Sequence, residues 1–311
     1  MISLTSPITA TNDISLIDTF SGQDIIALYQ QQLNIDVAAF FKTNPIFFLY
    51  QCNQTGYRFY TPEALAGDGD FYSALQQKLA GGYYHDWKFE NQLALDALKQ
   101  DDKILDIGCG IGNFITRAKT KTATACGLEL NKKAAAICRE KGLEVFDEMI
   151  AEHATQREGY YDMVCMFQVL EHIYDVKGFL ESAVITLKKG GKLVIGVPNN
   201  EPYFQGYDKY CTLNLPPHHM GLWNKEVFEK IAPLFNLTIN EIRYDVKGSI
   251  KTHAYLHAKY LLNIKSIAGK HSIVEKIKMI LMGIITIPIA IIKKISTGIN
   301  GSHIAIIFTK N

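Results

Sequence analysis

Three glycines at alternate positions stand out in the stretch ILDIGCGIGNF, which covers residues 104–114. An apolar run precedes them and a helical pattern follows, which predicts a strand, a tight turn and a helix. Glycine lets the backbone approach a ligand closely because it has no side chain, so the turn is a candidate ligand site, with a purely structural turn as the alternative. The dinucleotide pattern G-x-G-x-x-G is not met, because the sixth position counted from Gly108 is Asn113.

Two acidic residues accompany this turn: Asp106 at the end of the predicted strand, and Glu129 in the later stretch GLELN. A carboxylate at Asp106 would repel a pyrophosphate but attract a cationic ligand. An acidic residue at the end of the second strand of a nucleotide-binding sheet accepts hydrogen bonds from ribose hydroxyls, which is the role expected for Glu129. A ligand with a ribose and a positive charge fits both residues, and S-adenosylmethionine has both features.

Together with FQVLEHIYD at residues 167–175, these motifs resemble those of the class I S-adenosylmethionine-dependent methyltransferases. The resemblance covers roughly residues 85–200 and is weaker across NLPPHHMGLW and the final strand. It implies an enzyme with a Rossmann-like α/β fold and S-adenosylmethionine as cofactor. It also implies a seven-stranded sheet whose last strand is antiparallel, with helices on both faces.

The resemblance implies a set of cofactor-binding residues as well. The turn from Asp106 to Gly112 would hold the methionine part and Glu129 the ribose, while Asp147 would lie near the adenine. Two residues at the tip of the fourth strand would lie along the cofactor. The expected cofactor-binding residues are Asp106, Gly108, Cys109, Gly110, Gly112, Glu129, Asp147, Phe167 and Gln168.

Two adjacent histidines in LPPHH are the candidates for chemistry on the methyl acceptor. Methyl transfer from a sulfonium needs a base only when the acceptor is a hydroxyl, and histidine is well suited to that task. His219 is the first candidate, His218 the second, and His172 in LEH the third. Alternatively, the pair only stabilises its loop, and Glu171 and His172 only cap the next helix. A zinc site at the pair is not expected, because no third ligand lies nearby in the sequence.

The acceptor class follows from a second resemblance. YQCNQTGYRFY near the N-terminus, LPPHH and an insert rich in Ile and Lys are similar to segments of bacterial methyltransferases of surface-glycan assembly. This implies O-methylation of a sugar hydroxyl in a glycan or glycolipid, with a quinone-type phenol as the alternative acceptor. A non-catalytic cofactor-binding partner subunit is a further alternative.

Nucleic acid is not expected as a partner. The 32 Lys and Arg residues nearly balance the 31 Asp and Glu residues, which gives a net charge of +1. The sequence also shows no basic pattern interleaved with aromatic residues. The partner expected is therefore a small-molecule or glycan acceptor, and the oligomeric state is not predicted.

Alternating strands and helices must position these residues. The strands expected are KILDIG, ATACGLE, LEVF, YYDMVCMF and KLVIGVP, with helices at 112–119, 131–141 and 176–187. Such alternation predicts a parallel sheet with helices on both faces. We expect a methyltransferase domain at 85–311 and an apolar helical insert at about 253–297, before the last strand. Residues 1–84 should form a small accessory α/β region with lead-in helices, including a hairpin of IFFLYQC and YRFY.

The insert contains KIKMILMGIITIPIAIIKKI, residues 276–295, with an uncharged centre from Met279 to Ile292. As a helix this centre would extend about 21 Å, which is too short for a hydrocarbon core of about 30 Å. Flanking lysines favour peripheral contact with an anionic membrane, and a helix buried within the protein or in a dimer is the alternative.

The cellular compartment is predicted from two further features. The first 18 residues contain no Lys or Arg and no long apolar run, so a secretory signal is not expected. The six cysteines show no paired spacing, which is typical of reduced thiols. We therefore expect a cytoplasmic protein, placed at the inner face of the cytoplasmic membrane, with no bound metal.

Overall fold

The structure is a computed structural model of the 311-residue chain. It describes residues 4–79, 87–122, 124–201, 211–245, 273–274, 277–278, 280–281 and 301–311. Most of the insert expected at 253–297 therefore lies outside the described residues. No helix within the described ranges is long and apolar enough to cross a membrane.

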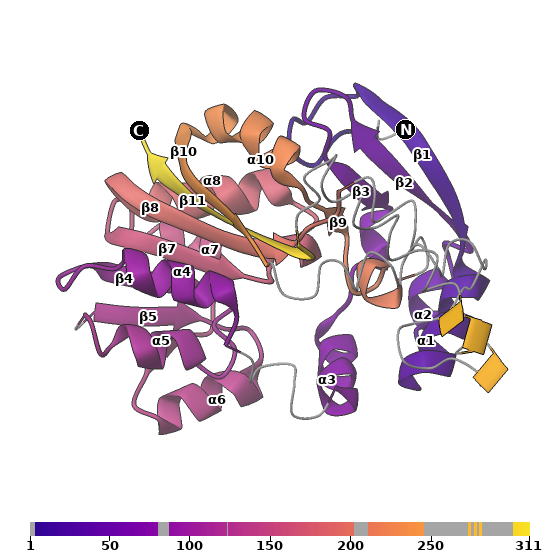
Figure 1. The fold of residues 1–311 in the computed structure, drawn as a ribbon, viewed down its shortest axis with the longest axis horizontal. Coiled ribbons are helices and arrows are strands. Elements are labelled where there is room, and N and C mark those ends of the chain that lie inside the picture. Colours follow the sequence, from indigo (N-terminus) through magenta and orange to yellow (C-terminus); the bar gives the residue numbers. More distant parts are fainter. Residues whose placement is uncertain are drawn as a thin grey trace.

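A seven-stranded sheet forms the larger part of the described chain, in the order β10-β11-β8-β7-β4-β5-β6 (Figure 1). Its strands are β4 (Lys103–Ile107), β5 (Thr124–Leu128), β6 (Glu144–Phe146), β7 (Tyr161–Phe167), β8 (Leu187–Pro198), β10 (Leu237–Tyr244) and β11 (His303–Lys310). The pairs from β8 through β6 are parallel, whereas β11 is antiparallel to both of its neighbours. The predicted seven-stranded sheet with an antiparallel last strand is confirmed.

Helices cover both faces of this sheet. They are α4 (Phe89–Ala97), α5 (Asn113–Ala118), α6 (Lys132–Glu140), α7 (Ile150–Ala154), α8 (Val176–Thr186) and α10 (Lys225–Ile231). Successive residues of a strand point to opposite faces, so Ile104 packs with α4, α5 and α6, whereas Leu105 packs with α7, α8 and α10. The helices predicted at 112–119, 131–141 and 176–187 correspond to α5, α6 and α8, whereas the short α7 was not predicted.

Polar residues at the helix starts explain where several of these helices begin. The side chain of Asn131 accepts hydrogen bonds from the N–H groups of Lys133 and Ala134 at the start of α6. Asp175 and Asn224 accept in the same way at the starts of α8 and α10. Each of these caps satisfies backbone donors that have no partner within the helix.

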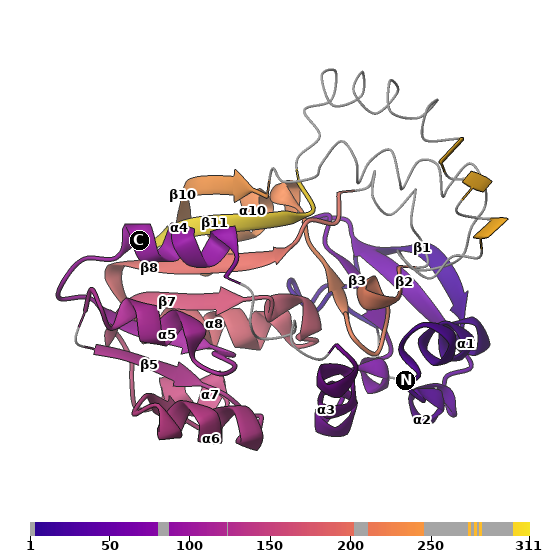
Figure 2. The same cartoon turned by 60° about the horizontal axis from the view of Figure 1, so that its bottom comes forward.

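The N-terminal part of the chain contributes β1, β2 and β3, seen in indigo and violet in Figure 1, to a second, four-stranded sheet in the order β1-β2-β3-β9. Its elements are β1 (Ile14–Ser21), α1 (Gly22–Leu33), α2 (Ala38–Phe41), β2 (Ile46–Cys52), β3 (Arg58–Thr61), α3 (Gly69–Lys78) and β9 (Gly221–Leu222). β2 and β3 form the predicted hairpin. β9 comes from much later in the chain and pairs with β3, which ties the two sheets together. Figure 2 shows the two sheets side by side.

Candidate active site

A cavity of about 760 Å³ lies at the carboxyl ends of the central strands, between the two sheets. Parallel α/β sheets bind ligands at this edge, where the loops after neighbouring strands meet. Loops after β4, β5, β7 and β8 line one side of the cavity. The loop that carries His218 and His219 lines the other side, together with Tyr72 of α3.

The glycine turn after β4 adopts a backbone that other residues rarely adopt. Gly108, Gly110 and Gly112 have φ angles of 72°, 56° and 77°. A side chain at Gly108 would place its Cβ 2.6 Å from Cγ2 of Val169, so that position has no room for one. The backbone of this turn therefore forms part of the cavity wall at Gly108 and Gly110, as the spacing predicts.

Glu129 holds this turn in place. One carboxylate oxygen accepts a 2.8 Å hydrogen bond from the N–H of Gly110, and the other accepts a 2.7 Å bond from the N–H of Asn131. Each oxygen has further acceptor capacity, so the expected bonds to a ribose remain feasible. The role in fixing the turn was not predicted from the sequence.

The charge of Asp106 and Glu129 suits a cationic ligand. Asp106 is buried, and its Oδ1 has no hydrogen-bond partner among the described residues. Burial and the nearby Glu129 raise the pKa of Asp106 well above its ordinary value. Burial also raises the pKa of Glu129, although the N–H groups of Asn131 and Gly110 oppose the shift. A ligand with sulfonium and ammonium groups would stabilise both carboxylates, so these residues fit S-adenosylmethionine.

Two residues at the end of β7 extend this wall. Phe167 packs edge to face on Phe114, with ring centroids 5.0 Å apart. Gln168 has a φ of 57°, an unusual backbone for a residue other than glycine, and its side chain donates to Glu90. Unfavourable backbone conformations of this kind are concentrated at ligand sites.

Seven of the nine expected cofactor-binding residues line the cavity. They are Asp106, Gly108, Cys109, Gly110, Glu129, Phe167 and Gln168. Gly112 does not line it but sets the turn, since it is the residue before α5 and a Cβ there would lie 2.3 Å from Cδ1 of Leu143. Asp147 does not line the cavity either, although it is near enough to influence the pKa of Glu129. Its adenine contact stays a prediction.

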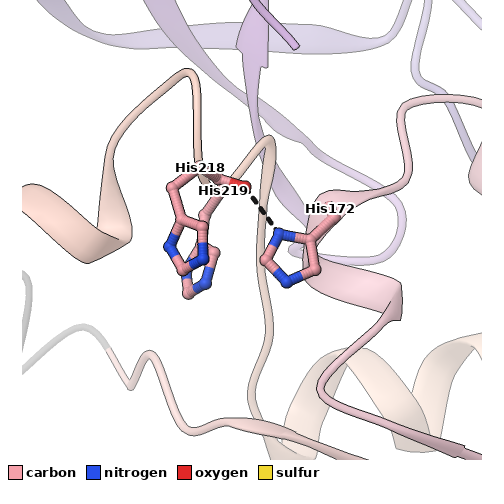
Figure 3. Close-up of side chains that lie close together, drawn as sticks. All are labelled: His172, His218 and His219. Atoms are coloured by element: carbon pink, nitrogen blue, oxygen red, sulfur yellow. Dashed lines mark hydrogen bonds between the residues drawn. The ribbon is translucent and has the colours of Figure 1, made fainter. Parts of the chain in front are cut away.

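Three histidines gather at the other end of the cavity (Figure 3). His172 ends a short 3-10 turn after β7, and His218 and His219 lie in the loop before β9. One ring nitrogen from each lies within 4.8 Å of those of the other two. The sequence argument against a metal site at the pair was that no third ligand lies nearby, and this reason fails because folding brings His172 to the pair.

Each of these rings is oriented by an oxygen at its Nδ1 atom. His172 Nδ1 lies 2.6 Å from the carbonyl oxygen of His218, and His218 Nδ1 lies 2.9 Å from that of Leu213. His219 Nδ1 lies 3.1 Å from Oδ1 of Asn214. Because these oxygens accept hydrogen bonds, we assign the proton of each neutral ring to Nδ1 and the lone pair to Nε2.

Burial keeps the three rings uncharged at neutral pH. It lowers the pKa of His172 to about 4, partly opposed by the backbone carbonyls of His218 and Gln168. Burial and the neighbouring His172 lower the pKa of His218 to about 3. The pKa of His219 also lies well below its ordinary value, first because of burial and then because of the other two rings. All three imidazoles thus offer a lone pair rather than a positive charge.

Sequence reasoning did not identify several residues around the cluster. Tyr72 donates to the carbonyl of His218, and Asn214 orients His219. Glu171 is fully buried, and its pKa is raised to about 8, chiefly by burial. His303 of β11 also lines the cavity. Glu171 lies in LEH, where the sequence analysis weighed it as a helix cap, and Asn214 lies in NLPPHHMGLW, whereas Tyr72 and His303 lie in no motif.

Comparisons with known proteins show which family the chain belongs to. The family model described as a methyltransferase domain matches residues 82–242, just over half of the chain. A ubiquinone biosynthesis O-methyltransferase from Aeromonas salmonicida is 32% identical over 106 residues, which are 32% of this chain and 44% of that protein. One from Pseudomonas aeruginosa is 25% identical over 161 residues, 45% of this chain and 69% of that protein. This chain thus spans less than half the length of the first of these relatives.

A solved structure agrees at the level of the fold. A SAM-dependent methyltransferase from Archaeoglobus fulgidus is 20% identical, with a TM-score of 0.51, covering 78% of this chain and all of that one. The matched family model spans β4 to β8 and includes the glycine turn. The acidic residues Asp106 and Glu129 suit a sulfonium ligand. The chain belongs to the methyltransferase domain family, and its cofactor is S-adenosylmethionine.

Proposed function

We propose that the chain methylates a hydroxyl oxygen of a small-molecule acceptor. One observation carries the proposal: three neutral imidazoles line the same cavity as the two carboxyl groups that suit a cationic cofactor. When bound, S-adenosylmethionine supplies a methyl group whose bond to sulfur breaks as a bond to the acceptor oxygen forms, leaving a neutral thioether. A hydroxyl must lose its proton during this step, and an uncharged imidazole is a suitable acceptor for it.

The residues divide between the two ends of the cavity. Asp106, Glu129 and the backbone of the glycine turn lie along the charged and ribose parts of the cofactor, and Phe167 and Gln168 extend the same wall. At the other end His219 is the first candidate for the group that activates the hydroxyl, followed by His218 and His172. His218 and His219 are buried, and the side chain of His172 is 16% exposed, so the rings have little contact with solvent.

Two acceptor classes remain candidates. The names of the relatives that match over part of this chain support a quinone-type phenol. The sugar hydroxyl of a glycan or glycolipid is supported by the resemblance of LPPHH and the N-terminal hairpin to glycan-assembly methyltransferases. Either hydroxyl must lose its proton during the transfer. The phenol needs less activation than the sugar hydroxyl because its pKa is lower.

An acceptor screen tests the proposal. The purified chain is incubated with isotope-labelled S-adenosylmethionine and panels of catechol-type phenols and sugar nucleotides, and label transfer is measured. In parallel, glycans and lipids of cells with and without the protein are compared by mass spectrometry for a 14-dalton difference. Tight cofactor binding without transfer to any hydroxyl in either assay would favour the alternative of a non-catalytic cofactor-binding subunit.

We also propose that the insert places the enzyme at the cytoplasmic face of an anionic membrane. The described residues Ile273, Val274, Ile277, Ile280 and Leu281 are helical and between 53% and 76% exposed. Residues 273, 277 and 280, and likewise 274, 277 and 281, are three or four positions apart, which puts all five on one face of a helix. Lysines at 270, 276 and 278 accompany them in the sequence, which suits anionic headgroups.

Cosedimentation with vesicles tests this placement. The intact chain should sediment with phosphatidylglycerol vesicles at low salt, and a chain shortened across residues 272–297 should not. The matched variant Ile277→Asp with Ile280→Asp should bind more weakly without affecting the cavity. An intact chain that ignores the vesicles would contradict the proposal and favour a helix that packs against protein.

A further inference from the structure

We propose that His172, His218 and His219 form a binding site for a divalent transition-metal cation, with Zn²⁺ as the first candidate. A role of the cation in catalysis would rest on the proposed function, whereas its binding does not. The site lies in the wall of the cavity that the glycine turn also lines. The three histidines come from two segments of the chain that only the fold brings together.

The first support is the distance between the rings. One nitrogen from each histidine lies within 4.8 Å of the other two, and the ring centroids are between 4.3 and 4.9 Å apart. Zn–N bonds of about 2.0–2.1 Å in tetrahedral geometry place the nitrogens about 3.3 Å apart. The rings therefore need to approach by about 1.5 Å or less, which rotation of the side chains can supply.

The second support is the orientation of the rings. Histidines that bind metals usually donate the other ring N–H to a carbonyl or carboxylate oxygen, which fixes the ring and leaves the second nitrogen for the metal. All three rings here follow this arrangement: Nδ1 faces an oxygen of His218, Leu213 or Asn214. Nε2 is then the lone-pair nitrogen in every case.

The third support is the charge around the cluster. Three neutral imidazoles, those of His218 and His219 buried and that of His172 partly buried, present lone pairs without the proton that would repel a cation. The buried carboxyl of Glu171 lies 4.0 Å from Nε2 of His172, and neither of its oxygens has a hydrogen-bond partner among the described residues. When ionised, a carboxyl group at that distance offsets the positive charge of a bound cation.

The ligand set selects the kind of metal. Nitrogen ligands from imidazole suit zinc, copper, nickel and iron, whereas magnesium and calcium require oxygen ligands. Three protein ligands leave a fourth position open for water or a substrate, as at catalytic zinc sites. An acceptor hydroxyl in that position would lose its proton more readily, because a bound cation lowers the pKa of an oxygen ligand. Because the imidazole lone pairs would then be bound to the cation, the proton would leave to water instead of to one of the three rings.

Metal titration of the intact chain tests the site without any acceptor. The protein is stripped with a chelator and titrated with Zn²⁺ by calorimetry and with Co²⁺ by visible absorption. We expect one tight equivalent and a visible Co²⁺ spectrum without a thiolate charge-transfer band, because no cysteine is a ligand. His172→Ala and His219→Ala should each weaken binding by about 100-fold or more, whereas His303→Ala, a cavity histidine outside the cluster, should not.

A second pair of variants separates metal binding from a structural role of the histidines. Asn214→Asp keeps an acceptor for Nδ1 of His219 and should preserve affinity, whereas Asn214→Leu removes it and should weaken binding about tenfold. No tight equivalent in the intact chain would overturn the proposal, and so would binding that survives both His→Ala changes. Full metal binding without methyl transfer would instead contradict the proposed function alone.

Discussion

The two ends of the cavity are built in different ways. The cofactor end is local: Gly110 and Glu129, which bond to each other, are 19 positions apart and follow neighbouring strands. The histidine end is assembled from distant segments, since Tyr72 and His218, which also bond to each other, are 146 positions apart. A local site requires only the correct strand and turn, whereas a distant one requires that both sheets are in place. The two ends should therefore respond separately to mutation.

The largest expected effect is on the histidine end. His219→Ala should lower turnover by about 100- to 10,000-fold, because it removes the first candidate for hydroxyl activation. Cofactor affinity, measured by calorimetry, should change less than about twofold, since the ring is absent from the glycine turn. His218→Ala provides the paired variant. Equal activity of both variants and the intact chain on the true acceptor would exclude the pair and leave His172 to be tested.

The next effect concerns the cofactor end. Glu129→Ala should weaken S-adenosylmethionine binding about 10- to 100-fold, because charge-assisted hydrogen bonds contribute roughly 1.5–3 kcal/mol each and water replaces part of that. Turnover at saturating cofactor should stay within about threefold. Glu129→Gln should lie in between, because it keeps one acceptor oxygen. Unchanged affinity in a folded Glu129→Ala protein would remove this residue from the site.

Substitutions in the glycine turn should have a smaller effect, on the free energy of unfolding. They separate the cost of an unfavourable backbone conformation from the cost of a steric clash. Gly108 and Gly142 have φ angles of 72° and 71°, but a Cβ meets Val169 only at Gly108, and nothing lies within 4 Å at Gly142. Gly142→Ala should cost about 1–2 kcal/mol of unfolding free energy from backbone conformation alone. Gly108→Ala should cost more in urea denaturation. Equal costs would show that Val169 moves aside freely.

The smallest effect is a pH dependence confined to the cofactor end. Burial raises the pKa of Asp106 and of Glu129, and a cationic ligand binds the ionised form of each. Affinity should therefore rise as the pH increases from the ordinary carboxyl pKa of about 4 towards the raised values, and level off above them. The slope should not exceed about tenfold per pH unit for each carboxyl. Calorimetry in buffers of different ionisation enthalpy should detect proton release on binding, and Asp106→Asn should reduce it.

The sequence was sufficient for the parts of the molecule that depend on local pattern. Alternating apolar runs located β4 to β8, and the glycine spacing with Asp106 and Glu129 indicated residues that line one cavity in the structure. The helix α7 was missed because its five residues are too few to show a helical period.

The histidine end was only partly predictable. LPPHH and LEH each drew attention to histidines, but no pattern indicates that the two motifs meet. Their meeting depends on β9 joining the N-terminal sheet, a pairing of two residues with no periodic signal. Tyr72 and Asn214 support the cluster through single hydrogen bonds, which sequence spacing does not encode.

The attachment of the histidine loop has a consequence for how such enzymes diversify. Tyr29 donates to the carbonyls of Thr212 and Leu215, and the N–H groups of Tyr60 and Gly67 donate to those of Met220 and Pro217. The N-terminal region thus positions the loop that carries His218 and His219, while the glycine turn makes none of these bonds. Exchange of the first 79 residues between homologues would therefore be a route to altered acceptor selectivity on an unchanged methyl-donor site. Deletion of those residues would leave a chain able to hold its donor but with no shaped surface for the molecule to be methylated.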